Sequence, residues 1–153
     1  MKVGAISDTH GYFDIKLYDV FNGVSHIFHS GDIGEISIIE RLQEIAPVTA
    51  VRGNNDAGIF LPYIKCVQLG KFKFLITHKF GSGKYDLIVR EKIFIENPNV
   101  VIFGHTHFFV NYYEEGRLFL NPGYSGHPNG IWERTVAIIN CDGDQPLAKI
   151  IQL

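Results

Sequence analysis

The stretch MKVGAISDTHG, residues 1–11, begins with an apolar run typical of a buried β-strand and ends in Asp8, His10 and Gly11. In open α/β sheets, ligands bind at the carboxyl ends of strands, where such polar residues lie. Asp8 and His10 are separated by one residue, so in an extended chain their side chains point the same way. The stretch therefore predicts an α/β sheet and two candidate metal ligands at the end of its first strand.

Four further apolar runs end in a side chain that can bind a metal ion. They are HIFHS before Asp32, PVTAVRG before Asn54, KFKFLIT before His78, and NVVIFG before His105. His105 and His107 repeat the spacing of the first pair. Because the carboxyl ends of the strands form one rim, we expect these residues to converge there although they are distant in sequence.

The remaining periodicity indicates how the chain is organised. Amphipathic stretches with helical spacing separate the first strands, at residues 14–21, 35–45 and 85–94. Later strands follow closely, with turn signals between them at 114–116 and 121–123. This order predicts a βαβ half followed by an antiparallel half, arranged as two packed sheets with helices outside. Since the chain has no repeat or linker, we expect a single domain over residues 1–153.

Composition narrows the class of protein. The 153 residues are 46% hydrophobic and 20% charged, which is typical of a globular chain with a real core. A formal net charge of -2 gives no general attraction to nucleic acid or to an anionic membrane. No apolar run reaches the ~20 residues of a membrane span, and Asp8 interrupts any signal-peptide core. We therefore expect a cytoplasmic protein.

The candidate ligands favour two metal ions over one. Asp8, His10, Asp32, Asn54, His78, His105 and His107 offer more donors than one tetrahedral site takes. A carboxylate such as that of Asp32 can bridge two ions. Oxygen and imidazole donors without a thiolate favour transition metals over calcium. We expect two divalent ions, manganese first, with nickel, cobalt, iron or zinc as alternatives.

Five motifs in order carry a family resemblance: SDTHG (7–11), SGDIG (30–34), GNND (53–56), ITH (76–78) and GHTH (104–107). With them the chain resembles the calcineurin-like metallophosphoesterase superfamily. Its length, early DTHG and late NPGYS look like the small bacterial and archaeal phosphodiesterases related to the retromer scaffold subunit. The resemblance implies a four-layer αββα sandwich of two mixed β-sheets flanked by helices.

The resemblance also implies roles for the ligands. Asp8, His10 and His107 would hold the first metal, Asn54, His78 and His105 the second, and Asp32 would bridge them. The implied activity is the hydrolysis of small phosphodiesters, with a metal-bridging hydroxide as the nucleophile.

The chain departs from the family pattern at two places. Many members carry His where this chain has Asn55, which cannot transfer a proton but can donate a hydrogen bond. We expect Asn55 to contact the substrate phosphate. Lys79 and Phe80 follow His78 in place of the more usual Gly-His. Asp56 could orient a ligand imidazole or serve only as a turn carboxylate.

A second class of function stays open. The retromer subunit shows that this fold can also serve as a protein-binding scaffold, with or without bound metal. The complete ligand set favours catalysis on a small phosphoester, and exposed edge strands make a homodimer plausible. The aromatic group Phe108, Phe109, Tyr112 and Tyr113 could be core, a substrate wall or a protein-binding patch. We interpret the histidines outside the ligand set, His26, His29 and His127, as structural.

Overall fold

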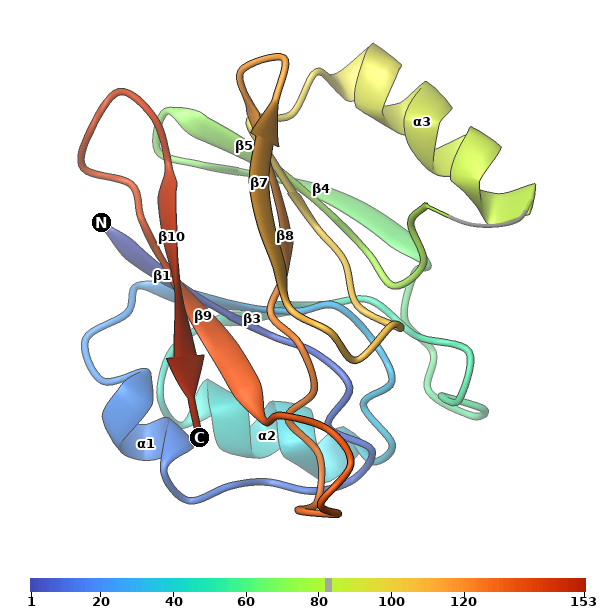
Figure 1. Ribbon diagram of the computed structural model, residues 1–153, viewed down its shortest axis with the longest axis vertical. Coiled ribbons are helices and arrows are strands. Elements are labelled where there is room, and N and C mark those ends of the chain that lie inside the picture. The colour runs from blue at the N-terminus through green and yellow to red at the C-terminus, as the bar shows by residue number, and fades with distance from the viewer. Residues whose placement is uncertain (82–83) are drawn as a thin grey trace.

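Two five-stranded sheets stack face to face, with helices on both outer sides (Figure 1). This computed structural model describes residues 1–81 and 84–153, with side-chain surroundings for all of these except residues 84 and 85. The layers follow the order helices, sheet, sheet, helix, so the expected four-layer αββα sandwich is confirmed. Within the described residues no helix has the length and apolarity needed to cross a membrane.

The first sheet has the strand order β10-β9-β1-β2-β3 and is mixed. Strands β1, β2 and β3 run parallel, and β9 runs antiparallel to both β1 and β10. The strands are β1 (Lys2–Ile6), β2 (His26–His29), β3 (Val48–Ala50), β9 (Thr135–Asn140) and β10 (Leu147–Gln152). Strands β1, β2 and β3 correspond to the apolar runs that precede Asp8, Asp32 and Asn54, and β9 and β10 are among the closely spaced strands expected in the second half.

The second sheet has the order β4-β5-β6-β8-β7, with β5, β6 and β8 parallel and both edges antiparallel. Its strands are β4 (Ile64–Leu69), β5 (Phe72–Thr77), β6 (Val100–Ile102), β7 (Val110–Glu114) and β8 (Arg117–Asn121). The apolar runs do not predict the edge strands β4 and β7. β4 is only partly buried and β7 is mostly exposed, and polar residues interrupt the apolar pattern in their sequences IKCVQL and VNYYE.

Three helices complete the layers: α1 (Leu17–Val20), α2 (Ile36–Gln43) and α3 (Lys84–Glu96). The helix expected over residues 14–21 is only one turn long. Its first residues form tight turns, in which the Asp14 carboxylate accepts a hydrogen bond from the backbone of Lys16 at 2.9 Å and pairs with Arg134 at 2.6 Å. The other two helices lie where the periodicity predicts them.

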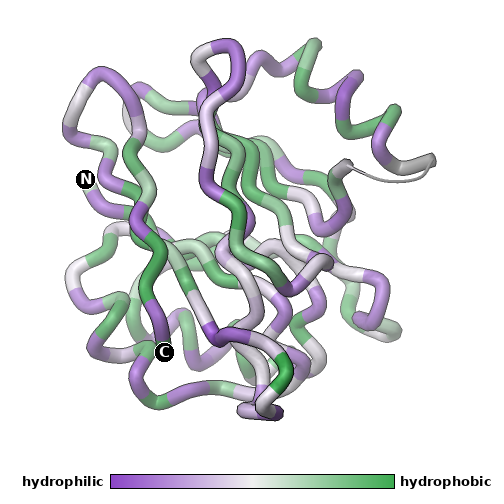
Figure 2. The backbone as a smooth tube through the Cα atoms, viewed as in Figure 1, coloured by the Kyte–Doolittle hydropathy of each residue, from purple (hydrophilic) through white to green (hydrophobic). Residues whose placement is uncertain are grey.

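The hydrophobic core is divided into three parts, one between each pair of layers. The largest lies between the sheets, where the rings of Phe28 and Phe74 pack with centroids 4.9 Å apart. A second part lies under α1 and α2 and a third under α3. Figure 2 shows the apolar strands at the centre and the polar connections around them. Burial on both faces explains why the central strands read as continuous apolar runs.

The stacking brings the ends of two sheets together. Strands β1 to β3 belong to the first sheet, and β5 and β6 belong to the second. The sequence predicts one rim at the strand ends, whereas the structure has two adjacent rims, one from each sheet. The Ser30 hydroxyl donates to the carbonyl oxygen of Phe103 at 3.0 Å, and Nδ1 of His78 contacts the carbonyl oxygen of Ser30 at 2.9 Å. These contacts tie the two rims to each other.

Candidate metal centre

Two compact groups of possible ligands lie where the rims meet. One is formed by Asp8, His10 and His107, and the other by Asp8, Asp32 and His78. Within each group the ligand atoms all lie within 4.8 Å of one another. The groups share Asp8, so the centre can hold two adjacent ions.

The carboxylate of Asp8 has two different surroundings. Its Oδ2 atom accepts hydrogen bonds from the Ser7 hydroxyl at 2.6 Å and from the backbone N–H of His105 at 3.1 Å. Its Oδ1 atom is buried without a hydrogen-bond partner among the described residues and lies 3.5 Å from Nε2 of His107. One oxygen is thus fixed by the protein, and the other faces the ligand cluster.

The imidazole of His78 is oriented in a similar way. Its Nδ1–H donates to the backbone carbonyl of Ser30, which leaves Nε2 as the atom that faces the centre. Nε2 is buried with no hydrogen-bond partner in the described part of the chain, and it lies 3.3 Å from Oδ1 of Asp32. Burial opposes its charged form, but the carboxylates of Asp32 and Asp8 raise the pKa of His78 above its ordinary value.

Asp32 belongs to the second group and also faces His10 of the first. One of its oxygens is 3.3 Å from Nε2 of His78 and the other is 3.9 Å from Nε2 of His10. Asn55 holds this carboxylate with its backbone N–H at 2.9 Å and its side-chain amide at 2.7 Å. Burial works in the opposite direction, but His78 and the hydrogen bonds from Asn55 keep the pKa of Asp32 well below its usual range. Asp32 therefore stays ionised and faces a histidine of each group.

The donor set fits divalent metal ions. The described residues contain three buried side-chain atoms without a hydrogen-bond partner, and two of them, Oδ1 of Asp8 and Nε2 of His78, face this cluster. Burying such atoms costs free energy unless a ligand supplies the missing partner. Oxygen and imidazole nitrogen are also the donors that Mn, Fe, Co, Ni and Zn accept.

The backbone at the centre adopts a rare conformation. Five candidate ligands have positive φ angles: 54° at Asp8, 46° at His10, 52° at Asp32, 75° at His105 and 64° at His107. The expectation that the two i, i+2 pairs lie in extended chain is therefore wrong. Each of these five residues lies in the left-handed region, two to five residues after the end of its strand. Such strain gathers at functional sites, where the surrounding structure maintains it.

Two glycines allow the loops to approach the carboxylates closely. A Cβ atom on Gly53 would lie 2.0 Å from Oδ1 of Asp32, and one on Gly104 would lie 2.0 Å from the Ser7 hydroxyl. Neither loop could hold its present position with a larger residue.

His29 stabilises the loops of the metal centre through buried hydrogen bonds. It is fully buried, and its Nδ1 accepts from the backbone N–H of Gly31 at 3.2 Å. Its Nε2 faces the Thr9 hydroxyl at 2.9 Å, and that hydroxyl donates to the carbonyl of Ile33 at 2.9 Å. Burial lowers the pKa of His29 to about 4, so the ring is neutral with its proton on Nε2. This chain of bonds fixes both neighbours of Asp32 and the residue between Asp8 and His10.

The other predicted site residues lie around these groups. His105 packs against His78 with ring centroids 5.2 Å apart, and Asn54 lines a cleft together with His78. Burial and the nearby charges of His78 and Lys79 lower the pKa of His105. The side-chain amide of Asn55 donates one hydrogen bond to Asp32, and its expected contact with the substrate phosphate stays a prediction.

Of the two roles expected for Asp56, its contacts match that of a turn carboxylate. Its carboxylate is buried and accepts from the backbone N–H groups of Gly34 at 2.9 Å and Gly53 at 2.7 Å. It therefore ties the loop that carries Asp32 to the loop that carries Asn54.

Aromatic side chains surround His107. Its ring meets Trp132 edge-on, with centroids 4.9 Å apart, and lies 5.0 Å from the ring of Tyr124. Phe108 also packs on Trp132, at 5.1 Å. The sequence gives no signal for Trp132, because it stands in a loop with no periodic pattern. Tyr124, by contrast, belongs to the NPGYS motif.

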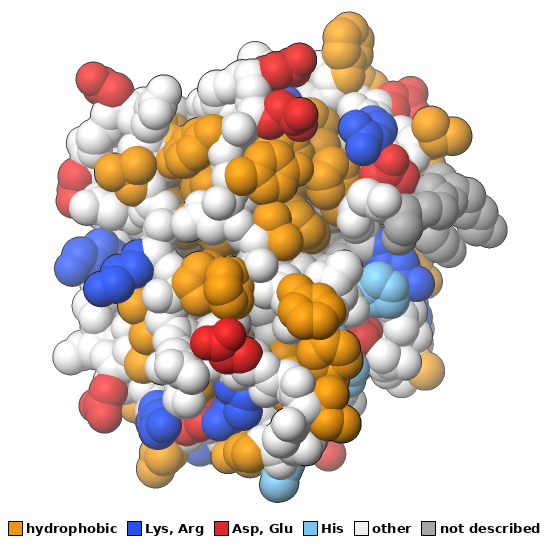
Figure 3. Space-filling model, in the orientation of Figure 1, with side chains coloured by type: hydrophobic (Ala, Val, Ile, Leu, Met, Phe, Trp, Pro, Cys, Tyr) orange, Lys and Arg blue, Asp and Glu red, His pale blue; other side chains and the backbone are white. Residues whose placement is uncertain are grey.

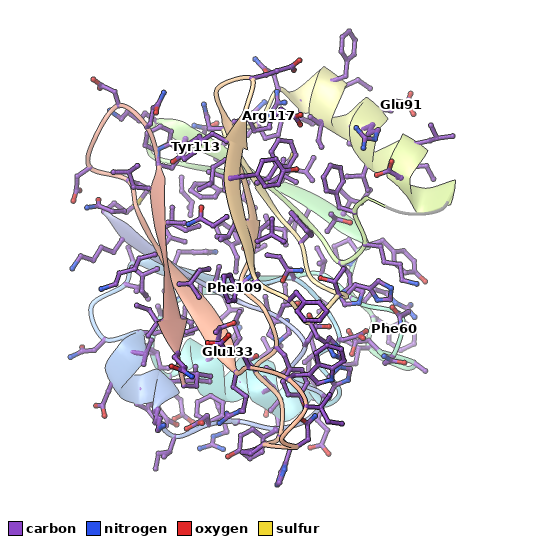
Figure 4. All side chains as sticks on the ribbon, viewed as in Figure 1. Phe60, Glu91, Phe109, Tyr113, Arg117 and Glu133 are labelled. Carbon is purple, nitrogen blue, oxygen red and sulfur yellow. The ribbon has the colours of Figure 1, made fainter. Side chains whose placement is uncertain are left out.

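The aromatic group that follows GHTH separates into two parts. Phe108 lies beside the centre, whereas Phe109 and Tyr113 lie at opposite ends of β7 (Figure 4). Figure 3 shows hydrophobic side chains gathered over this part of the sheet. Tyr112 stacks on Phe119, and the Tyr113 hydroxyl donates to the carbonyl of Pro146, so both rings help to cover the second sheet.

Comparison with known proteins agrees with this geometry. Residues 1–144 match the calcineurin-like phosphoesterase superfamily domain. A probable metallophosphoesterase of Methanothermobacter thermautotrophicus is 30% identical over 161 residues, covering 99% of this chain and 92% of the relative. The solved structure of an archaeal phosphodiesterase is 25% identical with a TM-score of 0.77, covering 99% and 100% of the two chains. A Vps29 variant from Entamoeba histolytica is 18% identical with a TM-score of 0.74, covering 100% and 99%, and thus shares the fold.

Proposed function

The chain belongs to the calcineurin-like phosphoesterase superfamily, and we propose that it is a binuclear metal-dependent phosphodiesterase acting on small phosphodiesters. The observation that carries the proposal is the two ligand groups that share Asp8. Two buried atoms without a hydrogen-bond partner among the described residues, Oδ1 of Asp8 and Nε2 of His78, face the same small volume. The relative described as an archaeal phosphodiesterase supports the choice of a diester.

The proposed ligand roles are those that the family resemblance implies. Asp8, His10 and His107 would hold the first ion, and Asn54, His78 and His105 would hold the second. Asp32, whose carboxylate oxygens face His10 and His78, would bridge the ions. Two bound divalent ions supply a water with a pKa lowered towards neutrality and a positive field for the charge that grows on the phosphoryl oxygens.

The protein's own side chains prepare this chemistry in advance. Asn55 and Ser7 fix the two carboxylates, so the ligands need little rearrangement when ions bind. Asp56 and His29 hold the loops that carry them. With Asn at position 55, this residue cannot protonate the leaving group.

A scaffold role is the second candidate. The observation in its favour is the exposed aromatic surface of β7, on a fold shared with Vps29. In that role the metal centre would stabilise the fold without turnover.

A direct assay separates the two functions. Protein stripped of metal and reloaded separately with Mn, Ni, Co, Zn or Mg is assayed with bis(4-nitrophenyl) phosphate and with 4-nitrophenyl phosphate. We expect metal-dependent release, faster from the diester, that His107→Ala abolishes. Two bound ions per chain without release from either ester would support the scaffold role instead.

Manganese as the resident ion, the cytoplasmic location and the homodimer stay predictions.

A further inference from the structure

A cleft of about 450 Å³ opens beside the metal centre, on the side of Asn54 and His78. Its walls come from the loop after β3, from β4 and β5, and from α3 (Figure 1). The volume lies within the range of about 300 to 1,000 Å³ that is typical of small-molecule sites. A substrate whose phosphate sits at the centre can therefore extend one of its substituents into this cleft.

Arg52 is the first cation of the cleft. Its Nε atom is buried and has no hydrogen-bond partner among the described residues, which makes it the third such atom beside those of the metal centre. The guanidinium lies over the ring of Tyr63, with Cζ 4.8 Å from the ring centroid, and this stacking holds it in place. A buried donor without a partner is costly, unless a ligand supplies the acceptor.

Lys79 is the second cation, and it directly follows the ligand His78 at one of the two departures from the family pattern. Among the described side chains, the lysines and arginines in ion pairs are Lys71, Lys73, Arg90 and Arg134. Arg52 and Lys79 are not in that set, so neither has a carboxylate partner in the part of the chain that the structure describes. Two positive charges without an internal counterion therefore line one cleft.

The rest of the lining is mainly apolar. Ile64, Ile88 and Val89 form a wall together with the ring of Tyr63. A ligand with an apolar body can pack on this wall while a terminal anion reaches the cations. Arginine binds carboxylate and phosphate groups with two parallel hydrogen bonds, which suits it to such a group.

From these observations we propose that the cleft binds the substituent of the phosphodiester that stays on phosphorus, and that it selects a substituent with an apolar body and a second anionic group. The anionic group is a carboxylate or a phosphate bound by Arg52 and Lys79. This inference rests on the proposed phosphodiesterase function, because the scissile phosphate must occupy the adjacent centre.

A matched pair of esters tests the selection. Benzyl 4-nitrophenyl phosphate and its 4-carboxybenzyl analogue have the same leaving group and differ only in the second anion. With the Mn-loaded enzyme we expect kcat/KM to be at least about tenfold higher for the carboxylate, mainly through KM, because a hydrogen bond to a charged group is lost without it. The phosphate analogue of the same benzyl ester distinguishes the two anions.

Variants assign the preference to the two cations. Arg52→Gln and Lys79→Gln should each reduce the ratio of the two kcat/KM values towards one. Lys65→Gln is the matched control, because this lysine is exposed on β4 next to Ile64 but is not part of the cleft lining. Equal loss for both esters in Arg52→Gln would overturn the proposal, since it would place Arg52 on the scissile phosphate. A ratio near one in the unaltered enzyme would also overturn it.

A binding measurement separates this inference from the proposed function. Isothermal titration of the Mn-loaded protein compares benzylphosphonate with 4-carboxybenzylphosphonate, neither of which needs to be hydrolysed. Tighter binding of the carboxylate that Lys79→Gln abolishes would support the cleft even if neither ester is cleaved. Hydrolysis of both esters with equal affinities for the two phosphonates would reject the cleft and leave the phosphodiesterase function intact.

Discussion

Oδ1 of Asp8 lies 3.5 Å from Nε2 of His107, and this carboxylate oxygen has no hydrogen-bond partner among the described residues. The two residues lie almost a hundred positions apart and come from different sheets. Because this buried oxygen is unsatisfied and lies so close to an imidazole nitrogen, the two atoms are arranged to share a cation.

The first prediction concerns Asp8. In Asp8→Asn the amide cannot satisfy the two donors at Oδ2 and also present an anionic oxygen to His107. We expect Mn²⁺ to raise the Tm of the metal-stripped wild type clearly and that of this variant far less, because a ligand stabilises the fold according to its affinity. Calorimetry with and without Mn²⁺ measures this. Asp19→Asn, an exposed carboxylate on α1, should match the wild type, and equal Mn²⁺ shifts for Asp8→Asn would refute the role.

A second prediction uses the close approach at Gly53. A methyl group there would collide with Asp32, so Gly53→Ala should reduce the free energy of unfolding by about 1 to 3 kcal/mol and weaken Mn²⁺ binding. Gly143→Ala is the control, because its nearest contact would be an ordinary 3.8 Å. Denaturant unfolding and Mn²⁺ titration of both variants provide the check. Unchanged metal affinity in Gly53→Ala would show that this loop does not position Asp32.

The third prediction is a pH dependence that arises from His29. Burial lowers the pKa of this imidazole from 6.5 to about 4. Between these two pH values the unfolded chain binds more protons than the folded chain, so stability falls as the pH drops from 6.5 and levels off below 4. The loss attributable to His29 should total roughly 3 kcal/mol.

The pH range of this loss distinguishes the contribution of His29 to stability from the contributions of His78 and Asp32. The raised pKa of His78 affects stability above pH 6.5, and the lowered pKa of Asp32 acts mainly below pH 4. Denaturant unfolding of the metal-stripped protein measures the slope, and His29→Gln should flatten it. The lowered pKa values of His26 and His105 leave a smaller slope of the same sign. An NMR titration that gives the His29 imidazole a pKa near 6.5 would contradict the account.

The fourth prediction concerns the leaving group. General-acid catalysis contributes about 10² to 10⁴-fold, and Asn55 cannot supply it. The rate of hydrolysis should therefore fall steeply along a series of aryl methyl phosphates as the pKa of the departing phenol rises. Asn55→Ala should lower the rates but keep the slope. A flat series in the wild type would mean that another group donates the proton.

Much of the fold is predictable from sequence because the central strands are buried on both faces and read as apolar runs. The edge strands β4 and β7 are not, since their exposed residues include polar and charged side chains. The one-turn helix α1 also differs from its periodic pattern, because Asp14 forms a local turn and an ion pair.

The candidate ligands are likewise visible in sequence, since each stands directly after an apolar run. Their left-handed backbone is not, because Asp and His adopt this conformation more often than most residues but still rarely, so their presence does not predict it. The buried support from Ser7 and Thr9 depends on contacts across the fold, so no local pattern predicts it. The same holds for Trp132 beside His107.

The most direct test of the central claim is a stoichiometric titration of metal-stripped protein with Mn²⁺, in which bound metal and hydrolysis of bis(4-nitrophenyl) phosphate are measured on the same samples. We predict little hydrolysis while the first equivalent binds and a rise to full activity as the second binds. Full activity at one ion per chain would contradict the binuclear centre. Two bound ions without hydrolysis would contradict the phosphodiesterase.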